Sequence, residues 1–434
     1  MNVADSQRVA SALEALGYSA VPRAEEADVI VLNTCVVRQS AEDKAVGRLS
    51  SLQAVKRKNP NVVINLMGCL VGIGGYTQLK ERFPHVDVFS PPSDPHPLVD
   101  YLTGKTRSRE EDLYEQAGAI LDEEYAFAIP ESEIGKSVCA FLPVIMGCSH
   151  ACTYCVIPLR RGKEFSRSPA EVLADAQRLV AQGIKEITLL GQIVDRYGLD
   201  LDQKTTLAAL LRELHAIDGL QRIRFLTSHP NWMHEDLLDA VAELPKVMPH
   251  FELPIQAGDD DVLRRMRRGY TTDQFLRIVE KIRARFKTVS IATDLIVGFP
   301  GESDAQFNNS VQAIKTIRPD MTHVARYSPR PGTYSAVHMA DDVPPDEKMR
   351  RFRVIENLQK KISDEINQSY LNKMVEVLFE EKVKQRWRGR TPTNKLVHVE
   401  SDENLLGEVR SVKIQWTGPW SMIGIMRNES RSLF

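Results

Sequence analysis

Short apolar runs alternate with helix-like segments along most of this 434-residue chain. In the first hundred residues the apolar runs are 28–32, 62–67 and 86–90, and segments with helical spacing of apolar residues precede or separate them. Apolar strands joined by helices are typical of parallel sheets, whose strands are buried on both faces. Residues 1–105 are therefore expected to form a Rossmann-like parallel α/β domain.

The alternation resumes after a charged linker that we place at residues 106–136. Residues 137–368 contain six strand-like runs separated by helical segments: 138–146, 186–190, 222–227, 250–255, 289–297 and 323–327. Ser168 and Glu171 form a capping-box pattern, with Pro169 at the first position of the helix. Six βα units predict a partial TIM-type (βα)6 barrel, although an open doubly wound sheet would give a similar pattern.

Residues 369–434 change character, because strand-like runs follow one another there without helices between them. The runs are 374–383, 395–400, 407–416 and 421–426. This pattern predicts a small all-β barrel, a fold that often binds single-stranded nucleic acid. Five basic residues with Trp387 among them favour phosphate contacts and base stacking by this barrel: Lys382, Lys384, Arg386, Arg388 and Arg390.

The charge balance excludes one class of nucleic-acid-binding protein. The chain has 56 Lys and Arg against 58 Asp and Glu, a net charge of −2, so it is not a polycation that coats nucleic acid. Binding would have to come from local patches. Two more such patches lie in the central region: Arg160, Arg161, Lys163 and Arg167, and Arg264, Arg265, Arg267 and Arg268.

The sequence also indicates the cellular compartment. Asp5 and Arg8 stand where a secretory signal would be apolar. The longest apolar stretch, residues 62–75, is interrupted by Asn65 and is too short to cross a bilayer. We therefore expect a soluble cytoplasmic protein without a membrane partner, in which the six cysteines form no disulfide framework.

Three of these cysteines, Cys148, Cys152 and Cys155, lie within eight residues at the end of the first central strand. Thiolates so close together can hold one inorganic centre. An iron–sulfur cluster held by three cysteines leaves one iron open to a ligand, whereas zinc would need a fourth protein ligand. Cys139 lies on the strand itself and is expected to be a packed core thiol.

Polar residues and glycines follow the other central strands, at the end where parallel barrels carry their active sites. The residues singled out there are Gln192, Ser228, Gln256, Asp294 and Gly298. Cys35 and Cys69 follow the same rule in the first sheet, since each stands just past an apolar strand. Parallel strands bring both cysteines to the edge of the sheet where such sheets bind ligands.

The cysteine pattern and the motifs around it resemble the radical S-adenosylmethionine (SAM) methylthiotransferase family. The resemblance covers nearly the whole chain and keeps the family's order: LNTC and MGC, CSHACTYCVIPLRRGKEFSR and LLGQ, then TSHP, LPIQAGDDDVLRRMRRGYT and IVGFPGE. The C-terminal barrel is similar to the RNA-binding TRAM domain, most clearly in GRTPTNKLV.

This resemblance implies an enzyme that inserts sulfur and a methyl group at an unactivated C–H bond. Its cofactors would be two 4Fe–4S clusters and SAM. Cys148, Cys152 and Cys155 would hold the radical-generating cluster, and Cys35 and Cys69 an auxiliary cluster that presents the sulfur. The SAM-binding residues would be Tyr154, Gln192, Ser228, Gln256, Asp294 and Gly298.

The chain departs from the family at its start. The family's auxiliary cluster has three cysteine ligands, and the first falls in a strand and turn just before the first helix. Here Met1 and Asn2 stand at that helix, so this cysteine would lie upstream of Met1. Either the natural N-terminus is longer, which we favour, or the auxiliary cluster is incompletely ligated. In the second case the enzyme would cleave SAM without transferring sulfur.

Three substrates occur in this family: N6-isopentenyladenosine next to the tRNA anticodon, threonylcarbamoyl-adenosine at the same place, and an aspartate of a ribosomal protein. LLGQIVDRYG and CVIPLRRGKEFSRS are most similar to the first branch, although Ile193 replaces an expected asparagine. We therefore expect a monomeric tRNA methylthiotransferase acting on carbon 2 of isopentenyladenosine. Its C-terminal barrel would grip the anticodon stem-loop, and its electron donor would be a protein such as flavodoxin or ferredoxin. A zinc-stabilised RNA-binding protein without redox chemistry is the alternative class.

Overall fold

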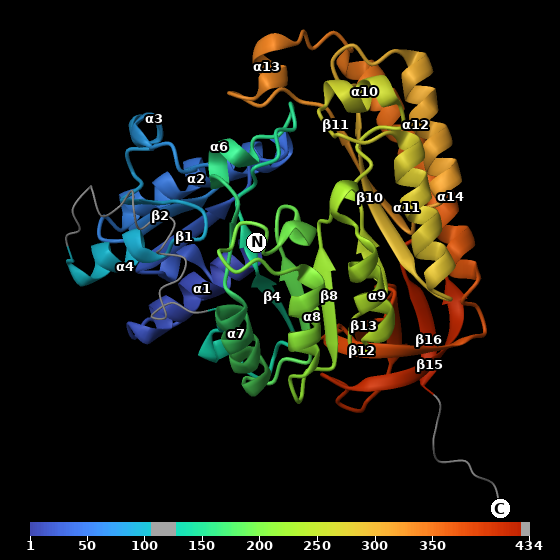
Figure 1. Cartoon of the computed structure of the whole chain (residues 1–434). Helices are drawn as coiled ribbons and strands as arrows, with labels where there is room; N and C mark the ends of the chain where they lie inside the picture. Colours follow the sequence, from blue (N-terminus) through green and yellow to red (C-terminus); the bar gives the residue numbers. More distant parts are fainter. Residues whose placement is uncertain (106–126, 427–434) are drawn as a thin grey trace, which may run out of the picture.

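The computed structural model of the chain describes residues 1–105 and 127–426. An N-terminal α/β region, a central partial barrel of parallel strands and a small C-terminal β-barrel follow one another (Figure 1). The predicted fold class is confirmed in all three parts. Most of the predicted linker, residues 106–126, lies outside the described residues.

Three parallel strands form the N-terminal sheet: β1 (Val29–Thr34), β2 (Val63–Gly68) and β3 (Val88–Ser90). Its helices are α1 (Asn2–Ala15), α2 (Gln39–Lys58), α3 (Thr77–Arg82) and α4 (His96–Thr103). Leu49 of α2 packs with Leu66 in one apolar cluster, and Val9 of α1 packs with Met67 in another. Both faces of the sheet are therefore covered, which explains why its strands are apolar throughout.

Six parallel strands form the central region: β4 (Cys139–Pro143), β7 (Glu186–Leu190), β8 (Arg222–Leu226), β9 (His250–Glu252), β10 (Ser290–Val297) and β11 (Met321–Arg326). The ladders β4–β7–β8 and β9–β10–β11 are joined by a bridge between Ile223 and Val247. The longer helices of this region are α7 (Pro169–Ala181), α8 (Leu207–His215), α9 (Glu235–Glu243), α11 (Thr272–Arg285), α12 (Asp304–Ile317) and α14 (Pro345–Gln368). Helix α7 begins with the predicted capping box of Ser168 and Glu171.

The predicted first strand of the barrel, residues 138–146, is two strands. After β4 the chain leaves the parallel ladder, and β5 (Ile145–Met146) pairs antiparallel with β6 (Phe165–Ser166). The hydrophobic pattern of the sequence did not show the break between β4 and β5, because apolar residues continue through residue 144. The short hairpin brackets residues 147–164, which carry the three clustered cysteines.

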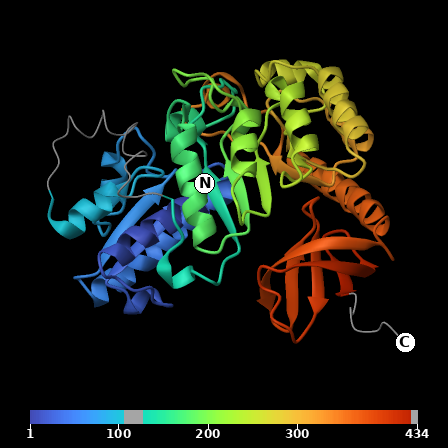
Figure 2. The same ribbon diagram turned by 60° about the horizontal axis from the view of Figure 1, so that its bottom comes forward.

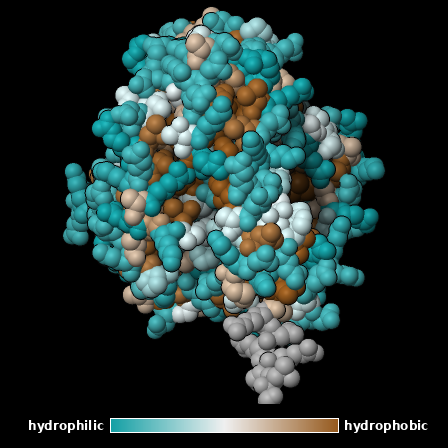
Figure 3. Space-filling model, turned by 90° about the vertical axis from the view of Figure 1, so that its right-hand side faces the viewer, coloured by the Kyte–Doolittle hydropathy of each residue, from teal (hydrophilic) through white to brown (hydrophobic). Residues whose placement is uncertain are grey.

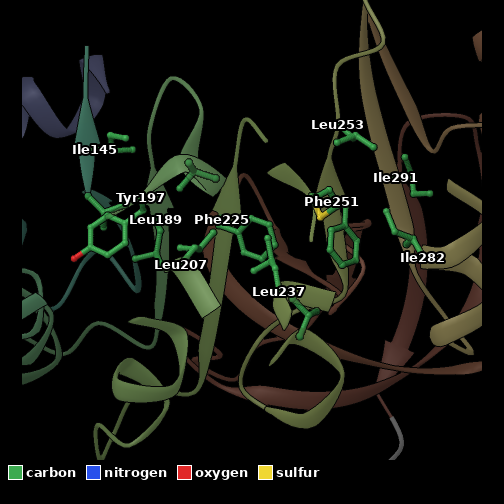
Figure 4. Packing of buried hydrophobic residues seen from close by; sticks show 14 of the residues in the cluster. Ile145, Leu189, Tyr197, Leu207, Phe225, Leu237, Phe251, Leu253, Ile282 and Ile291 are labelled. Atoms are coloured by element: carbon green, nitrogen blue, oxygen red, sulfur yellow. The ribbon is translucent and has the colours of Figure 1, made fainter. Parts of the chain in front are cut away.

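One continuous apolar core fills the barrel and the space beneath its helices (Figure 4). Phe225 of β8 and Phe251 of β9 meet edge to face, with ring centroids 5.9 Å apart. Both rings are fully buried, and truncating such a ring to alanine costs about 3–5 kcal/mol. This packing fixes the strands whose carboxyl ends carry the predicted site.

Five strands close the C-terminal barrel: β12 (Met374–Val383), β13 (Arg386–Arg390), β14 (Leu396–Glu400), β15 (Val409–Thr417) and β16 (Met422–Met426). The sequence analysis missed β13. Only Trp387 and Gly389 of its five residues are buried, and the other three are arginines. A strand with so little apolar alternation resembles a basic loop in the sequence.

The C-terminal barrel docks at the amino ends of the central strands, opposite the end that carries the cysteines (Figures 1 and 2). Arg222 and Arg224 at the start of β8 are buried, and they donate hydrogen bonds of 2.7–2.8 Å to the main-chain oxygens of residues 390–392. Lys395 adds an ion pair of 2.6 Å with Asp320. Docking thus provides hydrogen-bond partners within the protein for the buried guanidinium groups of the central barrel and for the main-chain oxygens of the C-terminal barrel.

The side of the molecule that faces right in Figure 1 is mostly hydrophilic, and its hydrophobic side chains gather in furrows (Figure 3). In the described part of the chain, not one helix combines the length and apolar composition that a membrane span requires.

Candidate active site

The three clustered cysteines lie on one loop that leads from β5 to the short helix α6 (Ile157–Arg161). The Cys148 N–H donates to the carbonyl of Gly162 at 3.1 Å, which closes the base of the loop. Thr153 donates to the carbonyl of Arg265 at 3.0 Å, which holds the middle of the loop against α10 (Asp260–Arg265). All three thiols are free.

The three thiols differ in their surroundings. Burial raises the pKa of Cys148, and it raises the pKa of Cys155 to about 12. Burial acts in the same direction on Cys152, but His150 and the positive charge of Arg268 outweigh it and lower the pKa of Cys152 to about 7. His150 Nδ1 lies 3.1 Å from Cys152 Sγ, and Arg268 Nη1 donates to the same sulfur at 3.2 Å.

Apolar and aromatic side chains form the wall beside the loop. Cys148 packs with Ile157 and Ile193, and Cys155 and Trp232 lie against this group. Ile193, where the family has asparagine, is therefore part of the apolar wall. Such a wall excludes water from the thiols and strengthens the electrostatic effect of nearby charges.

The three thiols are of the residue type that holds an iron–sulfur cluster or zinc. Among residues 1–105 and 127–426, no three His, Cys, Asp or Glu side chains converge on a point that one metal ion could occupy. A cluster needs its three thiolates on separate irons and so accepts thiols spread along one wall. The thiols of Cys148, Cys152 and Cys155 are close enough for their charges to raise the pKa of Cys155 after burial has done so.

A cavity of about 730 Å³ opens beside Cys155, between the central barrel and the N-terminal region. A volume of this size suits a small-molecule cofactor. Three of the predicted SAM-binding residues line it, namely Tyr154, Gln256 and Asp294. The facing wall includes Arg38, at the start of α2.

The other three predicted SAM-binding residues are not among those that line the cavity. Gln192 is half-buried just past β7. Ser228 is buried just past β8, and its hydroxyl has no hydrogen-bond partner within the described residues. Gly298 follows β10 with a φ of 72°, and Lys348 packs closely over its Cα.

Sequence analysis missed several charged groups at the site. His323 and Lys348 line the cavity, and Arg268 reaches Cys152 from the segment after α10. Burial raises the pKa of Asp294, against the positive charges of His323 and Arg38. The motif RRMRRGY contained the signal for Arg268, but its arginines were all treated as one surface patch.

Cys35 and Cys69 meet at one edge of the N-terminal sheet, as predicted. They follow β1 and β2, whose last residues Thr34 and Gly68 are paired, and the Cys69 N–H donates to the carbonyl of Thr34 at 3.0 Å. Their charges act on each other, since Cys35 raises the pKa of Cys69 after burial has raised it. The amino group of Met1 is buried beside both cysteines, so the start of α1 belongs to this site.

Arg161 connects the two cysteine sites. It is the last residue of α6, which follows the Cys148–Cys155 loop, and its Nε donates to Cys69 Sγ at 3.3 Å. The same guanidinium donates to Asn2 at 2.9 Å and to Asp5 at 3.2 Å. Its side chain is only 4% exposed, so this positive charge acts on the Cys35 and Cys69 edge and is not part of an RNA-binding surface.

Carboxylates neutralise most of the predicted basic patches. In the C-terminal barrel each arginine has a glutamate partner: Arg386 with Glu400, Arg388 with Glu381 and Arg390 with Glu380. In the central region Arg264 and Arg265 both pair with Asp261, and buried Arg167 pairs with Asp175. These residues therefore add little net positive potential.

The predicted stacking role of Trp387 is wrong. Its ring is only 6% exposed and packs in the core of the C-terminal barrel with Val399 and Ile414. The alternation of β13 points it inward, whereas the sequence suggested an exposed aromatic among basic residues. The exposed aromatics of this barrel are Trp416 and Trp420, each 51% exposed.

Five cations on the cavity lining or on the segments after the cysteine loop and α10 have no carboxylate partner within the described residues. Arg38 and Arg326 line it, and both are exposed. Arg160 lies on α6, Lys163 follows that helix, and Arg267 follows α10. Within the described residues none of these five cations has an acidic side chain at ion-pair distance. Their charge remains available to a polyanion.

Comparisons with known proteins agree with this geometry. Residues 142–314 match the Radical SAM superfamily, and residues 1–90 match a family described as uncharacterized protein family UPF0004. Two similar curated proteins are named tRNA-2-methylthio-N(6)-dimethylallyladenosine synthase. The protein from Roseiflexus sp. (strain RS-1) is 44% identical over 98% of this chain and 87% of its own length. The one from Dehalococcoides mccartyi (strain CBDB1) is 45% identical over 97% of this chain and 95% of its own length.

Among solved structures, the chain is similar to the radical S-adenosylmethionine methyltransferase TsrM from Kitasatospora setae. The TM-score is 0.57, with 15% identity over 78% of this chain and 75% of that one. At this identity the likeness concerns the fold, which it supports independently of the sequence motifs.

Proposed function

Because the chain belongs to the family of tRNA-2-methylthio-N(6)-dimethylallyladenosine synthases, we propose that it adds a methylthio group to carbon 2 of N6-isopentenyladenosine beside the tRNA anticodon. The observation that carries the proposal is the loop of Cys148, Cys152 and Cys155, whose last cysteine lines a cofactor-sized cavity, in a chain similar to these enzymes over nearly its full length. Threonylcarbamoyl-adenosine and a ribosomal-protein aspartate are the other substrate classes that the test must separate.

A radical SAM enzyme carries a 4Fe–4S cluster and SAM, which together supply a radical able to break an unactivated C–H bond. We assign Cys148, Cys152 and Cys155 as the cluster ligands. Cys152, with its pKa of about 7, is the thiol most readily deprotonated for binding iron. Arg268 would balance the negative charge of the loaded site from its place beside Cys152.

Tyr154, Gln256 and Asp294 are the residues best placed to hold SAM, because they line the cavity next to Cys155. The carboxylate of Asp294 and the amide of Gln256 suit the amino and hydroxyl groups of this cofactor. Gln192, Ser228 and Gly298 do not line the cavity but stay in the proposal, because they follow the strands β7, β8 and β10 of the same barrel. The hydroxyl of Ser228 is buried without a hydrogen-bond partner in the described structure, so it is free to bind a ligand group.

Cys35 and Cys69 are proposed to hold a second 4Fe–4S cluster that presents the sulfur. Two thiols at one sheet edge, with the buried guanidinium of Arg161 donating to Cys69, support this assignment. A positive charge at this place stabilises thiolate over thiol and offsets the charge of a bound cluster. Any residue that preceded Met1 would begin at this same site.

The tRNA contacts are proposed to lie at the cavity mouth. Arg38, Arg160, Lys163, Arg267 and Arg326 are the cations that no carboxylate neutralises there. The C-terminal barrel would contribute through Trp416 and Trp420, which replace Trp387 in that role. We also propose that the chain acts as a monomer and receives its electron from flavodoxin, ferredoxin or a similar donor.

Deleting the C-terminal barrel would not test its RNA contacts cleanly. Arg222 and Arg224 are buried beneath it and would lose the carbonyl groups that accept their hydrogen bonds. A weaker affinity for tRNA could then follow from damage to the central barrel. The double substitution Trp416→Ala and Trp420→Ala leaves the docking contacts in place and is the better test.

The decisive experiment expresses the chain in a bacterium that lacks its own tRNA methylthiotransferase and analyses the tRNA nucleosides by mass spectrometry. Methylthiolated isopentenyladenosine is expected with the unaltered chain. Cys152→Ala should abolish both the modification and SAM cleavage, whereas Cys69→Ala should keep cleavage and lose the modification. Modification that persists with Cys69→Ala would exclude the auxiliary role.

Metal analysis of protein purified without oxygen distinguishes the proposed enzyme from the alternative class, a zinc-stabilised RNA-binding protein. Iron together with sulfide supports the proposal, whereas stoichiometric zinc without SAM cleavage supports an RNA-binding protein that lacks redox chemistry. SAM cleavage without methylthiolation would indicate that the auxiliary site is incomplete. The iron content of Cys69→Ala, compared with that of the unaltered chain, reports the second cluster directly.

A further inference from the structure

Three flat side chains form an exposed stack beside the cavity mouth, on and near the short helix α13 (Tyr334–His338) at the top of Figure 1. The guanidinium carbon of Arg267 lies 4.3 Å from the centre of the Tyr334 ring. The ring of His338 lies 4.6 Å from the same ring, centre to centre, and is tilted by 43° against it. Tyr334 is 44% exposed, and Arg267 and His338 are exposed as well.

Hydrogen bonds hold this stack in a fixed position relative to the cysteine loop. The N–H of Ser335, next to Tyr334, donates to the carbonyl of Thr153 at 2.8 Å. Thr153 lies between two of the proposed cluster ligands. The hydroxyl of Tyr327, which lines the cavity, bonds to Ser335 Oγ at 2.9 Å. A ligand on the stack would therefore stand at a set distance from the cavity.

Internal stability does not explain the stack. An exposed cation–π contact is weakly stabilising, and Arg267 has a φ of 57°, a left-handed conformation that residues with a side chain resist. Strained backbone of this kind collects at functional sites. Arg267 also has no acidic partner at ion-pair distance within the described residues, so its charge is available to a phosphate.

We propose that Arg267, Tyr334 and His338 bind an unpaired nucleobase that neighbours the target adenosine, by letting it extend their stack. This inference rests on the proposed function. When the target base leaves the anticodon loop for the cavity, the bases beside it lose a stacking partner, and that loss costs free energy. Aromatic rings and arginine planes are the protein groups that hold such bases, and Arg267 contacts the adjoining phosphate.

The test measures binding of an RNA hairpin with the anticodon stem-loop sequence to the reconstituted protein, by fluorescence anisotropy. Tyr334→Ala should weaken binding about 5- to 150-fold, the range for losing one stacked base. Tyr334→Phe keeps the ring and should bind like the unaltered chain. Tyr101→Ala is the matched control, because Tyr101 is 52% exposed on α4, away from this stack, and its loss should change nothing.

Two further readouts identify the partner. With an abasic nucleotide beside the target adenosine, the unaltered chain should bind more weakly and Tyr334→Ala should show no additional loss. Arg267→Gln should lower the dependence of log K on log salt by about one phosphate contact, whereas Tyr334→Ala should leave it unchanged.

Unchanged affinity in Tyr334→Ala, or an equal loss in Tyr334→Phe, would overturn the inference. If the affinity loss of Tyr334→Ala adds to the loss caused by an abasic nucleotide at every position, the base does not bind to Tyr334. That result would also overturn the inference. If the unaltered chain does not bind the hairpin but still cleaves SAM, the proposed tRNA substrate has failed, and that outcome is separate from failure of the stack.

Discussion

Replacing Gly147 with alanine should empty the first cluster site without unfolding the protein. Gly147 immediately precedes Cys148 and has a φ of 65°, in the left-handed region. An added Cβ would lie 2.6 Å from the carbonyl carbon of Lys163 and 2.8 Å from the carbonyl oxygen of Gly162, and closer still to the oxygen of Lys163. Real Cβ atoms keep at least 3.0 Å from such atoms, so main chain on one side must move.

The main chain that must move is the segment at Gly162 and Lys163, which closes the cysteine loop because the Cys148 N–H donates a hydrogen bond to the Gly162 carbonyl. A shift of about 1 Å at a reacting site can cost a factor of about 100 in rate. The left-handed conformation adds about 1–2 kcal/mol of destabilisation. Gly147→Ala should therefore remain folded, with SAM cleavage reduced about 100-fold or abolished.

Gly104→Ala is the control that separates the two effects. Gly104 has a φ of 69°, but an added Cβ there would meet no atom of the described residues within 4 Å. It should lose about 1 kcal/mol of stability, a shift of a few degrees in melting temperature, and keep full SAM cleavage. Iron content, melting temperature and deoxyadenosine production are measured for both variants. Full cleavage by Gly147→Ala would refute the view that this close approach positions Cys148.

Three further outcomes are expected. Trp387→Ala should cost about 3–5 kcal/mol in urea unfolding, because the ring lies in the core, and Trp416→Ala less than about 0.5 kcal/mol; equal effects would contradict the assignment of their faces. Burial, with the charges of Arg224 and Lys395, lowers the pKa of His250 to about 3. The unfolded chain binds a proton at His250 near pH 6.5, whereas the folded protein keeps this histidine neutral until about pH 3. Stability from this group is therefore present above pH 6.5, and between these two values the free energy of unfolding falls by about 1.4 kcal/mol for each pH unit of acidification. In His250→Gln this fall should be shallower, by the slope that one bound proton contributes; an unchanged slope would contradict the low pKa. Arg161→Gln should lower the iron content of the auxiliary site while SAM cleavage continues; unchanged iron would show that the hydrogen bond to Cys69 is dispensable.

Periodicity predicted most strands of the parallel sheets, because burial on both faces leaves an uninterrupted apolar run, but it merged β4 and β5 into one strand. The run of β7 matches its predicted bounds, residues 186–190. The same rule fails for β13, in which three of five residues are arginines that pair with glutamates on the neighbouring strands β12 and β14. A strand stabilised by cross-strand ion pairs has no hydrophobic alternation for a sequence pattern to detect.

The parts of the candidate site that depend on the spacing of residues in the sequence could be predicted. The parts that depend on the direction in which each side chain points could not. Cysteines within eight residues must lie together, and cysteines that end paired parallel strands must share an edge. Arg267 and Arg268 are adjacent in the sequence, yet one is exposed against Tyr334 and the other is buried against Cys152. The left-handed φ of Arg267 produces this divergence, and no residue pattern announced it.

The path from the cysteine loop to Cys69 would allow the two proposed cluster sites, which lie on different sheets, to act on one substrate. Helix α6 starts two residues after Cys155 and ends at Arg161, so its five residues span the boundary between the central barrel and the N-terminal region. Arg161 is held there by Asp5, whose carboxylate is fully buried and would be left without this ion pair if the two regions separated. The ion pair and the hydrogen bonds of Arg161 to Asn2 and Cys69 join the two regions at this point. A base seated in the cavity between the regions would thus meet both sites at a spacing that a single short helix sets.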